Sequence, residues 1–506
     1  MSSYTSRISA DSPVSMHPDE RPAMLEKAGM ERIANAVYTM TSGEGRTEIR
    51  IDNSWRGDIR WGRNTVGITE EHVDRNVLIV RRIGGTVAFK YTNQTSPSAL
   101  REVVQFVEHS ARAGAKRIIR PQMPSAPRLL ETPAPAIWSE ATVGVAVNER
   151  ARIAESVISK FKARDVLSSG FLEWRCLESM SFSFGDIHAS QPGAGEHAPE
   201  QNSNDEPTDG GDSNAVPASF YVRHTHAQCS MTAVHPSGTG SGWAGLSSFD
   251  WRAIDCDALV ARAIDKCLSS TTPGVLEPGR YTAILEPQAV SALATLIVNS
   301  LDRVTAERGA SAYAYQPDQQ LNVWRTRLGM KIVDERITIR HDPLDPMLGV
   351  LPMRGLRPVV WIEQGKLMNL AYSQAYAQQV LGEDVANLIR PSYRMEGGTT
   401  PVEEMIQTTK HGVLITRLSD FIVLKRTELL VTGQTHGGVW EIRDGRVLRA
   451  VHNMRFTDSP LLAFNTIDAV GPAVPVFAPS TDKLTPLVVP PIKVSSFALT
   501  ASSPSL

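Results

Sequence analysis

The sequence predicts an α+β protein, with mixed helices and strands in an N-terminal α/β region and a β-rich C-terminal domain. Apolar residues at helical spacing occur mainly before residue 301, whereas short apolar segments with tight turns dominate from there to about residue 478. Helical and strand-like segments do not alternate regularly, which argues against a doubly wound α/β fold. The 36 glycines and 32 prolines indicate many turns and hence a large β component.

The N-terminal elements follow from local patterns. Apolar residues at helical spacing predict a helix between residues 22 and 40. Two strand-like runs, 77–80 and 86–89, flank Gly84-Gly85 and predict a pair of strands. Ser96-Pro97 predicts the start of the next helix, because serine can cap the first amides and proline fits the first turn.

Later elements are predicted in the same way. Helices are expected over residues 148–166, 250–268 and 287–301. The segments 363–366 and 443–446 each contain a glycine and predict tight hairpin turns, because glycine adopts a positive φ at little cost.

A chain of 506 residues is too long for one ordinary core, so several domains are expected. The segment 189–219 has almost no large apolar residue and predicts a disordered loop. The predicted divisions are a flexible tail 1–20, an N-terminal α/β domain 21–120, a linker 121–136, a central α/β domain 137–276 with the loop 189–219, a C-terminal β-rich domain 277–478, and an extended or disordered tail 479–506.

Composition argues against several classes of function. Lys+Arg 52 against Asp+Glu 54 give a formal net charge of -2, so no basic excess indicates a nucleic-acid partner. The four cysteines form no CxxC pair, and no apolar run approaches the roughly 18 residues that cross a bilayer. We therefore expect a cytoplasmic protein with no membrane partner.

Two motifs favour a structural over a functional interpretation. The segment 240–245 matches GxGxxG, but the next helix is expected near Asp250, too late to place its amides on a pyrophosphate, so a flexible loop is predicted. Thr400-Pro-Val-Glu403 is a capping box that predicts a helix over 401–410, with proline at its first position. A helix start preceded by Gly397-Gly398 can also present free amides to a peptide.

His224, His226 and His235 have the residue type of a zinc site. On a strand, residues 224 and 226 point to the same face, so both imidazoles could reach one ion. Cys229 would point to the opposite face, and the ligand set does not close. A half-exposed strand with outward-facing histidines is the preferred interpretation.

Several segments of the C-terminal third occur in a distinctive order. They are Val360-Trp-Ile-Glu-Gln-Gly365, Gly397-Gly398-Thr-Thr-Pro-Val-Glu-Glu404, Gly412-Val-Leu-Ile-Thr416-Arg417, Thr432-Gly433-Gln434-Thr435, Trp440-Glu-Ile-Arg-Asp-Gly445 and Val451-His-Asn453-Met-Arg455-Phe456. In order and spacing they resemble the TldD/PmbA family of peptidase-related proteins, and a less specific likeness extends over about residues 30 to 475.

The resemblance implies a two-subunit peptidase. In the family, one subunit type carries HExxxH on a helix, with a cysteine of the C-terminal domain as a further zinc ligand. The other type, which is TldE/PmbA-like, has the same fold without these ligands. Together the two subunits enclose a channel that accepts unfolded peptide.

The family's metal helix corresponds here to residues 287–301, after the turn Glu286-Pro287. No histidine lies between His235 and His341, and no cysteine follows Cys267. A zinc ion needs ligands with lone pairs, and its bound water needs a base. The resemblance therefore implies no catalytic residue and no zinc in this chain, because the metal positions hold Thr295, Leu296 and Ser300.

The function that the resemblance implies is that of a non-catalytic subunit in proteolysis or peptide maturation. It would form a heterodimer with an HExxxH-bearing TldD-like homologue, which holds the zinc, and would help to bind unfolded peptide. The residues expected to contact substrate are Gly397, Gly398, Thr399, Thr435 and His436. Two alternatives stay open: a self-sufficient metallopeptidase with a relocated metal site at His224, His226 and His235, and a ligand-binding protein on the same fold.

Overall fold

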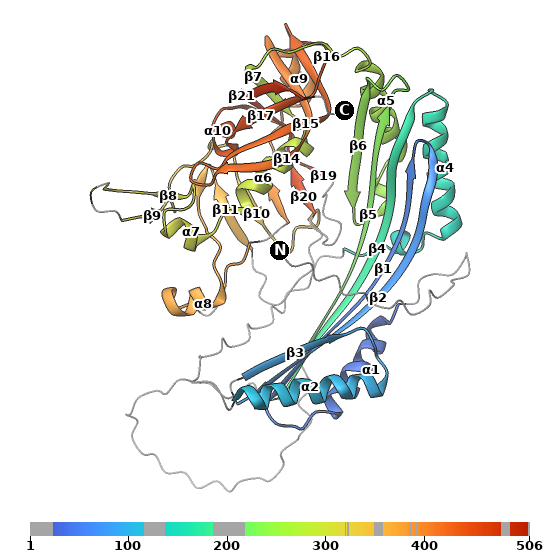
Figure 1. Ribbon diagram of the computed structural model, residues 1–506, viewed down its shortest axis with the longest axis vertical. Helices are drawn as coiled ribbons and strands as arrows, with labels where there is room; N and C mark the ends of the chain where they lie inside the picture. Colours follow the sequence, from blue (N-terminus) through green and yellow to red (C-terminus); the bar gives the residue numbers. More distant parts are fainter. Residues whose placement is uncertain are drawn as a thin grey trace.

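The computed structural model describes residues 24–84, 86–115, 137–185, 218–318, 320, 323–348, 358–383, 386–389, 392–476 and 486–503. The expected tail 1–20, the linker 121–136 and nearly all of the loop 189–219 lie outside these residues. The predicted α+β class is confirmed, because an N-terminal sheet with helices is followed by a strand-rich C-terminal unit (Figure 1).

Six antiparallel strands form one long N-terminal sheet in the order β3-β2-β1-β4-β5-β6. Four of the strands have 17 to 19 residues, so at about 3.3 Å per residue the sheet is roughly 60 Å long. The strands are β1 (Arg46–Gly62), β2 (Thr65–Ile83), β3 (Thr86–Thr92), β4 (Leu167–Phe184), β5 (Ala218–Val234) and β6 (Ser241–Ser248).

Helices cover the two ends of this sheet, each pair over its own core (Figure 1). One core includes Met30 and Val104, and the other includes Phe161 and Trp174. The first is covered by α1 (Glu26–Thr39) and α2 (Pro97–Ala115), and the second by α4 (Val147–Lys162) and α5 (Cys256–Ser269). Two short elements lie near the second core, α3 (Glu140–Val143) and the 3₁₀ turn η1 (Trp251–Ala253).

The regions expected as separate domains, 21–120 and 137–276, share this one sheet. β1 pairs with β4 along nearly its whole length, so that Ile51 lies opposite Met180 and Trp55 opposite Cys176. The division expected from the sequence falls at the proline-rich segment 121–136. Strand pairing across that segment is a long-range contact, which local patterns do not reveal.

Residues 241–245 of the GxGxxG segment lie in strand β6, and only Gly240 precedes it, so the prediction of a flexible loop was wrong for this part. The glycines of the segment allow α5 to lie directly on the strand. A Cβ on Gly242 would lie 2.2 Å from the carbonyl oxygen of Ala263, and one on Gly240 would lie 2.5 Å from that of Cys267. These glycines therefore serve the close approach of helix and strand.

The C-terminal unit contains two larger sheets. One has the order β14-β7-β21-β17-β15-β16 and closes on itself, because β14 also pairs with β15; the other has the order β12-β11-β10-β13-β20-β19. The strands are β7 (Gly279–Leu285), β10 (Ile339–His341), β11 (Val359–Glu363), β12 (Lys366–Leu367), β13 (Tyr393–Met395), β14 (His411–Lys425), β15 (Leu430–Arg443), β16 (Arg446–Val451), β17 (Met454–Asp458), β18 (Ile467–Val470), β19 (Val474–Val476), β20 (Leu487–Val489) and β21 (Ile492–Ser502).

Helix α6 (Pro287–Asn299) begins at the proline that the sequence indicated and packs into the main C-terminal core. Among the described residues, no helix combines the length and apolar character needed to cross a membrane. The smaller elements are α7 (Arg303–Glu307), β8 (Ala314–Tyr315), β9 (Arg325–Thr326), α8 (Gln374–Tyr376), the π-helix η2 (Ala377–Leu381), α9 (Val402–Gln407) and α10 (Pro460–Ala463).

Both predicted hairpin turns are confirmed. Gln364 and Gly365 have φ of 46° and 75°, and Asp444 and Gly445 have φ of 45° and 76°, as a two-residue turn with both centres in the left-handed region requires. The capping box is not confirmed, because Pro401 is the N-cap of α9 and no side chain caps it.

The C-terminal domain does not end at residue 478. Strand β21 pairs with β7, β17 and β18, and it buries Ile492, Val494 and Phe497. The expected extended or disordered tail is therefore an integral part of the sheet over residues 492–502. Its proline and serine content suggested an unfolded tail, but its apolar residues fill the core.

Candidate functional site

The N-terminal sheet meets the C-terminal unit at β6 and α5 (Figure 1). β6 stands at the end of its own sheet, and β19 stands at the end of the second C-terminal sheet. The two strands touch, but in the described part of the chain no hydrogen-bonded ladder joins them. Edge strands carry backbone groups without ladder partners. This contact therefore brings two open sheet edges together. We use the word seam for the whole contact of β6, α5 and the residues that follow α5 with the C-terminal unit.

Two adjoining cavities in the seam form a groove. One has a volume of about 440 Å³ and is bounded by β6, α5, the start of α6 and β19. The other has a volume of about 330 Å³ and reaches residues 346–348 and 486–487. Both volumes lie in the range of ligand sites. The cavities adjoin because four residues line both of them: Ser247, Ser248, Pro475 and Val476.

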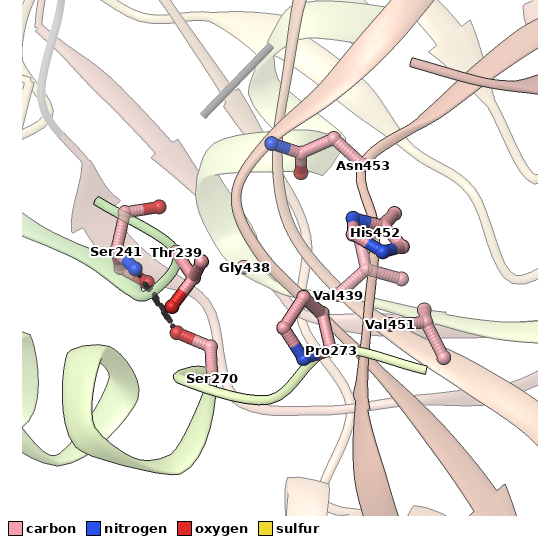
Figure 2. A pocket seen from close by; sticks show the side chains of 9 residues that line it. All are labelled: Thr239, Ser241, Ser270, Pro273, Gly438, Val439, Val451, His452 and Asn453. Atoms are coloured by element: carbon pink, nitrogen blue, oxygen red, sulfur yellow. Dashed lines mark hydrogen bonds between the residues drawn. The ribbon is translucent and has the colours of Figure 1, made fainter. Parts of the chain in front are cut away.

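Another part of the seam is closed by backbone hydrogen bonds. The Gly274 amide donates to the Ala450 carbonyl at 2.8 Å, and the His452 amide donates to the Gly274 carbonyl at 3.1 Å. Beside this closure lies a polar cavity of about 40 Å³, where the Ser270 hydroxyl bonds to the amide and the carbonyl of Ser241 (Figure 2). That cavity has room for only a few water molecules, so the groove is the better candidate for a larger ligand.

A largely buried ion pair fixes α5 against the start of α6. Lys266 Nζ lies 2.9 and 2.7 Å from the carboxylate oxygens of Glu286 and 2.9 Å from Thr416 Oγ1. It also lies 5.5 Å from the ring centroid of Trp440. Burial lowers the pKa of Lys266, and the charge of Glu286 opposes that shift. Because Glu286 lines the groove, this pair holds one groove wall in place.

A second cation, Arg417, stacks on Trp243. Its guanidinium is 4.7 Å from the Trp243 ring centroid, and its Nη2 donates to His436 Nδ1 at 2.7 Å. Burial lowers the pKa of Arg417 to about 10, so it stays protonated at neutral pH. Burial and the charge of Arg417 lower the pKa of His436, which suits a neutral imidazole that accepts this hydrogen bond.

The resemblance places the family's metal positions at Thr295 and Leu296 of α6 and at its C-cap Ser300. Thr295 Oγ1 lies 2.8 Å from Tyr393 Oη, and Ser300 Oγ lies 3.0 Å from Tyr313 Oη. Leu296 packs against the main C-terminal core. Two hydroxyls and an aliphatic side chain do not fit a zinc ion. Over the described residues as a whole, no group of three or more His, Cys, Asp or Glu could hold a metal ion.

The glycine segment expected to contact peptide packs beside the groove but does not line it. A Cβ on Gly397 would lie 2.4 Å from the Ala473 amide nitrogen, and one on Gly398 would lie 2.4 Å from the Val470 carbonyl oxygen. Thr399 is exposed beside them. None of these three residues belongs to the groove lining, and the glycines are explained by close packing against residues 470–473.

The other two expected contact residues lie on β15. Thr435 is buried; its hydroxyl donates to Asn453 Oδ1 at 3.3 Å and accepts from the Met454 amide at 2.8 Å. His436 reaches the seam through Arg417. No role in a site follows from the sequence for Lys266, Glu286 or Trp243, because only the tertiary contact brings them together.

His224 and His226 lie together on one face of β5, as strand alternation predicted, with ring centroids 6.3 Å apart. They are buried rather than half-exposed, because the C-terminal unit covers this face, and both line the 330 Å³ cavity. Burial lowers the pKa of His226 to about 3. His235 bonds to Ser237. It follows His226 by nine residues of nearly continuous strand, so the two residues lie roughly 30 Å apart along the chain. The three histidines therefore do not converge.

The fold and the seam define an α+β protein of two sheet-bearing units that meet at a groove. Residues 278–501 match the sequence profile described as the PmbA/TldA metallopeptidase C-terminal domain. The family likeness shown by this comparison is thus that of the PmbA/TldD metallopeptidase C-terminal domain, over residues 278–501. None of the curated proteins compared with the chain matches it.

Three crystal structures share the fold over nearly the whole chain. A proposed modulator of DNA gyrase from Thermotoga maritima MSB8 has a TM-score of 0.70 at 12% identity, over 93% of this chain and 100% of its own. TldE from Thermococcus kodakarensis has a TM-score of 0.68 at 14% identity, over 93% and 100%. Another proposed modulator of DNA gyrase, from Bacteroides thetaiotaomicron VPI-5482, has a TM-score of 0.67 at 13% identity, over 94% and 100%. At these identities the likeness concerns the fold.

Proposed function

We propose that this chain is the non-catalytic, TldE/PmbA-like subunit of a heteromeric zinc-dependent peptidase, and that it holds unfolded peptide for a zinc-bearing partner. One observation supports the proposal: Thr295 and Ser300, the residues expected at the family's metal positions, bond to buried tyrosines of the core, while the groove beside the start of α6 is open. A groove without a zinc ligand set supports binding rather than hydrolysis.

The two edge strands offer a way to bind peptide with little regard to its sequence. An extended peptide along β6 or β19 would form a ladder with the backbone groups of that edge. β6 has 8 residues, so a peptide along its whole length would span roughly 25 Å. Apolar side chains of the groove, such as Leu246 and Val476, would shield this ladder from water.

The proposed complex divides the work between two chains. The homologue with HExxxH supplies the zinc ion and the base for its water. This chain orients the peptide, and the Lys266–Glu286 pair keeps the groove wall in position. The absence of zinc ligands on α6 is then the expected feature of a partner subunit.

Co-expression with an HExxxH-bearing homologue from the same genome tests the subunit role. We expect the two chains to co-purify, and the pair to cleave unfolded peptides faster than the homologue alone. If no complex forms and the homologue cleaves peptides equally well by itself, the proposal is wrong.

The added-strand mode has its own test. N-methylation of alternate backbone amides removes the donors of a peptide but keeps its side chains. We expect the methylated peptide to bind much more weakly than the unmethylated peptide of the same sequence. Equal affinity of the two peptides would exclude a ladder on either sheet edge.

A further inference from the structure

Arg417 lies against the wall of the groove and is poorly solvated. Its guanidinium stacks on Trp243, and Trp243 lines the 440 Å³ cavity. Gly437 passes close to both, since a Cβ there would lie 3.0 Å from Trp243 Cβ and 3.3 Å from Arg417 Nε. The Nε atom of Arg417 is buried and has no hydrogen-bond partner among the described residues. Packing of this kind keeps the guanidinium in place but leaves donor capacity unused.

No carboxylate of the described chain neutralises Arg417. Its pKa is lowered by burial with no opposing contribution from an acidic group. Asp420, the acidic residue near His436, is held by the side chains of Gln434 and Ser419. A partly desolvated cation without a counter-charge is costly, and this cost disappears when an anion binds.

The surrounding charges add to this cationic character. Arg262 of α5 lines the groove, and both Arg262 and Arg417 lower the pKa of Lys266 by charge repulsion, so the three cations lie near one another. Two carboxylates line the same cavity: Glu286, both of whose oxygens bond to Lys266, and Asp255, which caps α5, so they are outnumbered by the three cations. This part of the seam therefore has an excess of positive charge that favours an anionic ligand.

We propose that Arg417, held in position by His436, binds a carboxylate of the peptide in the groove. The planar guanidinium can donate two parallel hydrogen bonds to a carboxylate. The imidazole of His436 accepts from Arg417 at Nδ1, which fixes the orientation of the guanidinium and leaves its remaining Nη hydrogens for the anion. The inference rests on the proposed peptide-binding function, to which it adds a fixed polarity and a preference for peptides with a free carboxylate at this point.

Three fluorescent peptides as long as β6 distinguish the sources of the carboxylate. All have the same neutral sequence; the first ends in a free carboxylate, the second in an amide, and the third is an amide with one glutamate. Binding to the full chain is measured by anisotropy, together with the homologue if the two form a complex. We expect the neutral amide to bind at least about tenfold weaker than the free acid. If the glutamate peptide binds as tightly as the free acid, the site recognises an acidic side chain. If it binds as weakly as the neutral amide, the site recognises the C-terminal carboxylate.

Variants identify the residue that recognises the charge. Arg417→Gln should abolish the difference between acid and amide, whereas Arg417→Lys, which keeps the charge but not the fork, should retain part of it. The matched control is Arg426→Gln, which removes an exposed arginine from the turn of the same β14–β15 hairpin and should leave the difference unchanged.

The outcomes separate the two proposals. If wild-type protein binds acid and amide equally, the carboxylate site is refuted while peptide binding stands. If it binds none of the peptides, the proposed function fails and the carboxylate site fails with it. The comparison of peptides on wild-type protein needs no variant, so it holds even if Arg417→Gln does not fold.

Discussion

Replacing Glu286 by glutamine removes the charge from the seam's largely buried ion pair while keeping the size of the side chain. Lys266 Nζ would keep its contact with Thr416 Oγ1, but its ammonium would lose the carboxylate that offsets burial. Breaking a buried pair typically costs about 3–5 kcal/mol. Because the two side chains are 12% and 21% exposed and glutamine retains an acceptor, we expect Glu286→Gln to lower the free energy of unfolding by about 2 kcal/mol.

The pH dependence of this loss has a definite sign. Without Glu286 the pKa of Lys266 in the folded protein falls further below its value in the unfolded chain. Between these two pKa values the unfolded state binds more protons, so the stability of the variant rises with pH in that window. The deficit relative to wild type should therefore shrink as the pH rises from 7 toward 10. Urea unfolding followed by tryptophan fluorescence measures it, since Trp440 lies over Lys266.

Two controls make this prediction specific. Glu428→Gln breaks an ion pair with Lys425 in which both side chains are 56% exposed, and should cost less than about 0.5 kcal/mol. The double variant with Lys266→Met and Glu286→Gln should recover most of the loss, because it leaves no unpaired charge in the seam. If Glu286→Gln is no less stable than Glu428→Gln, the pair does not hold the groove wall as argued.

Three further predictions follow from the packing. Gly242→Ala should destabilise the protein by about 2–3 kcal/mol, because its Cβ would lie 2.2 Å from the Ala263 carbonyl oxygen, whereas Gly67→Ala, with no atom within 4 Å of its Cβ, should be nearly neutral in the same urea titration. His226 has a folded pKa of about 3, well below its usual 6.5, so its contribution to stability is full above pH 6.5 and is lost as the pH falls toward 3; His226→Gln should flatten the stability profile in that window by up to about 1.4 kcal/mol per pH unit. A triple variant with Thr295→His, Leu296→Glu and Ser300→His would introduce the family's ligands at the positions expected for them. It should be less stable and should still bind less than one zinc ion per chain by metal analysis, because Tyr313 and Tyr393 fill the adjacent space. One zinc ion per chain would contradict that packing argument.

Much of the local structure was predictable, because it depends on neighbours in the chain. The start of α6 at Pro287 and the two hairpin turns follow from proline and glycine geometry. The common face of His224 and His226 follows from strand alternation. The interpretation of residues 241–245 as a flexible loop failed, because glycine also serves close packing and the packing helix lies elsewhere in the sequence.

The sequence by itself determined the α+β class, the main helices, and the lack of any histidine or cysteine between residues 287 and 301. Each depends on residue identity or on a period of a few residues, which a local pattern can express. Only the tertiary structure decided that the first two regions share one sheet, that β21 completes the C-terminal domain, and that Trp243, Glu286 and Arg417 meet at the seam. These features depend on contacts between residues far apart in the chain, and burial at the seam gives Lys266 and Arg417 pKa values that their local sequence does not suggest.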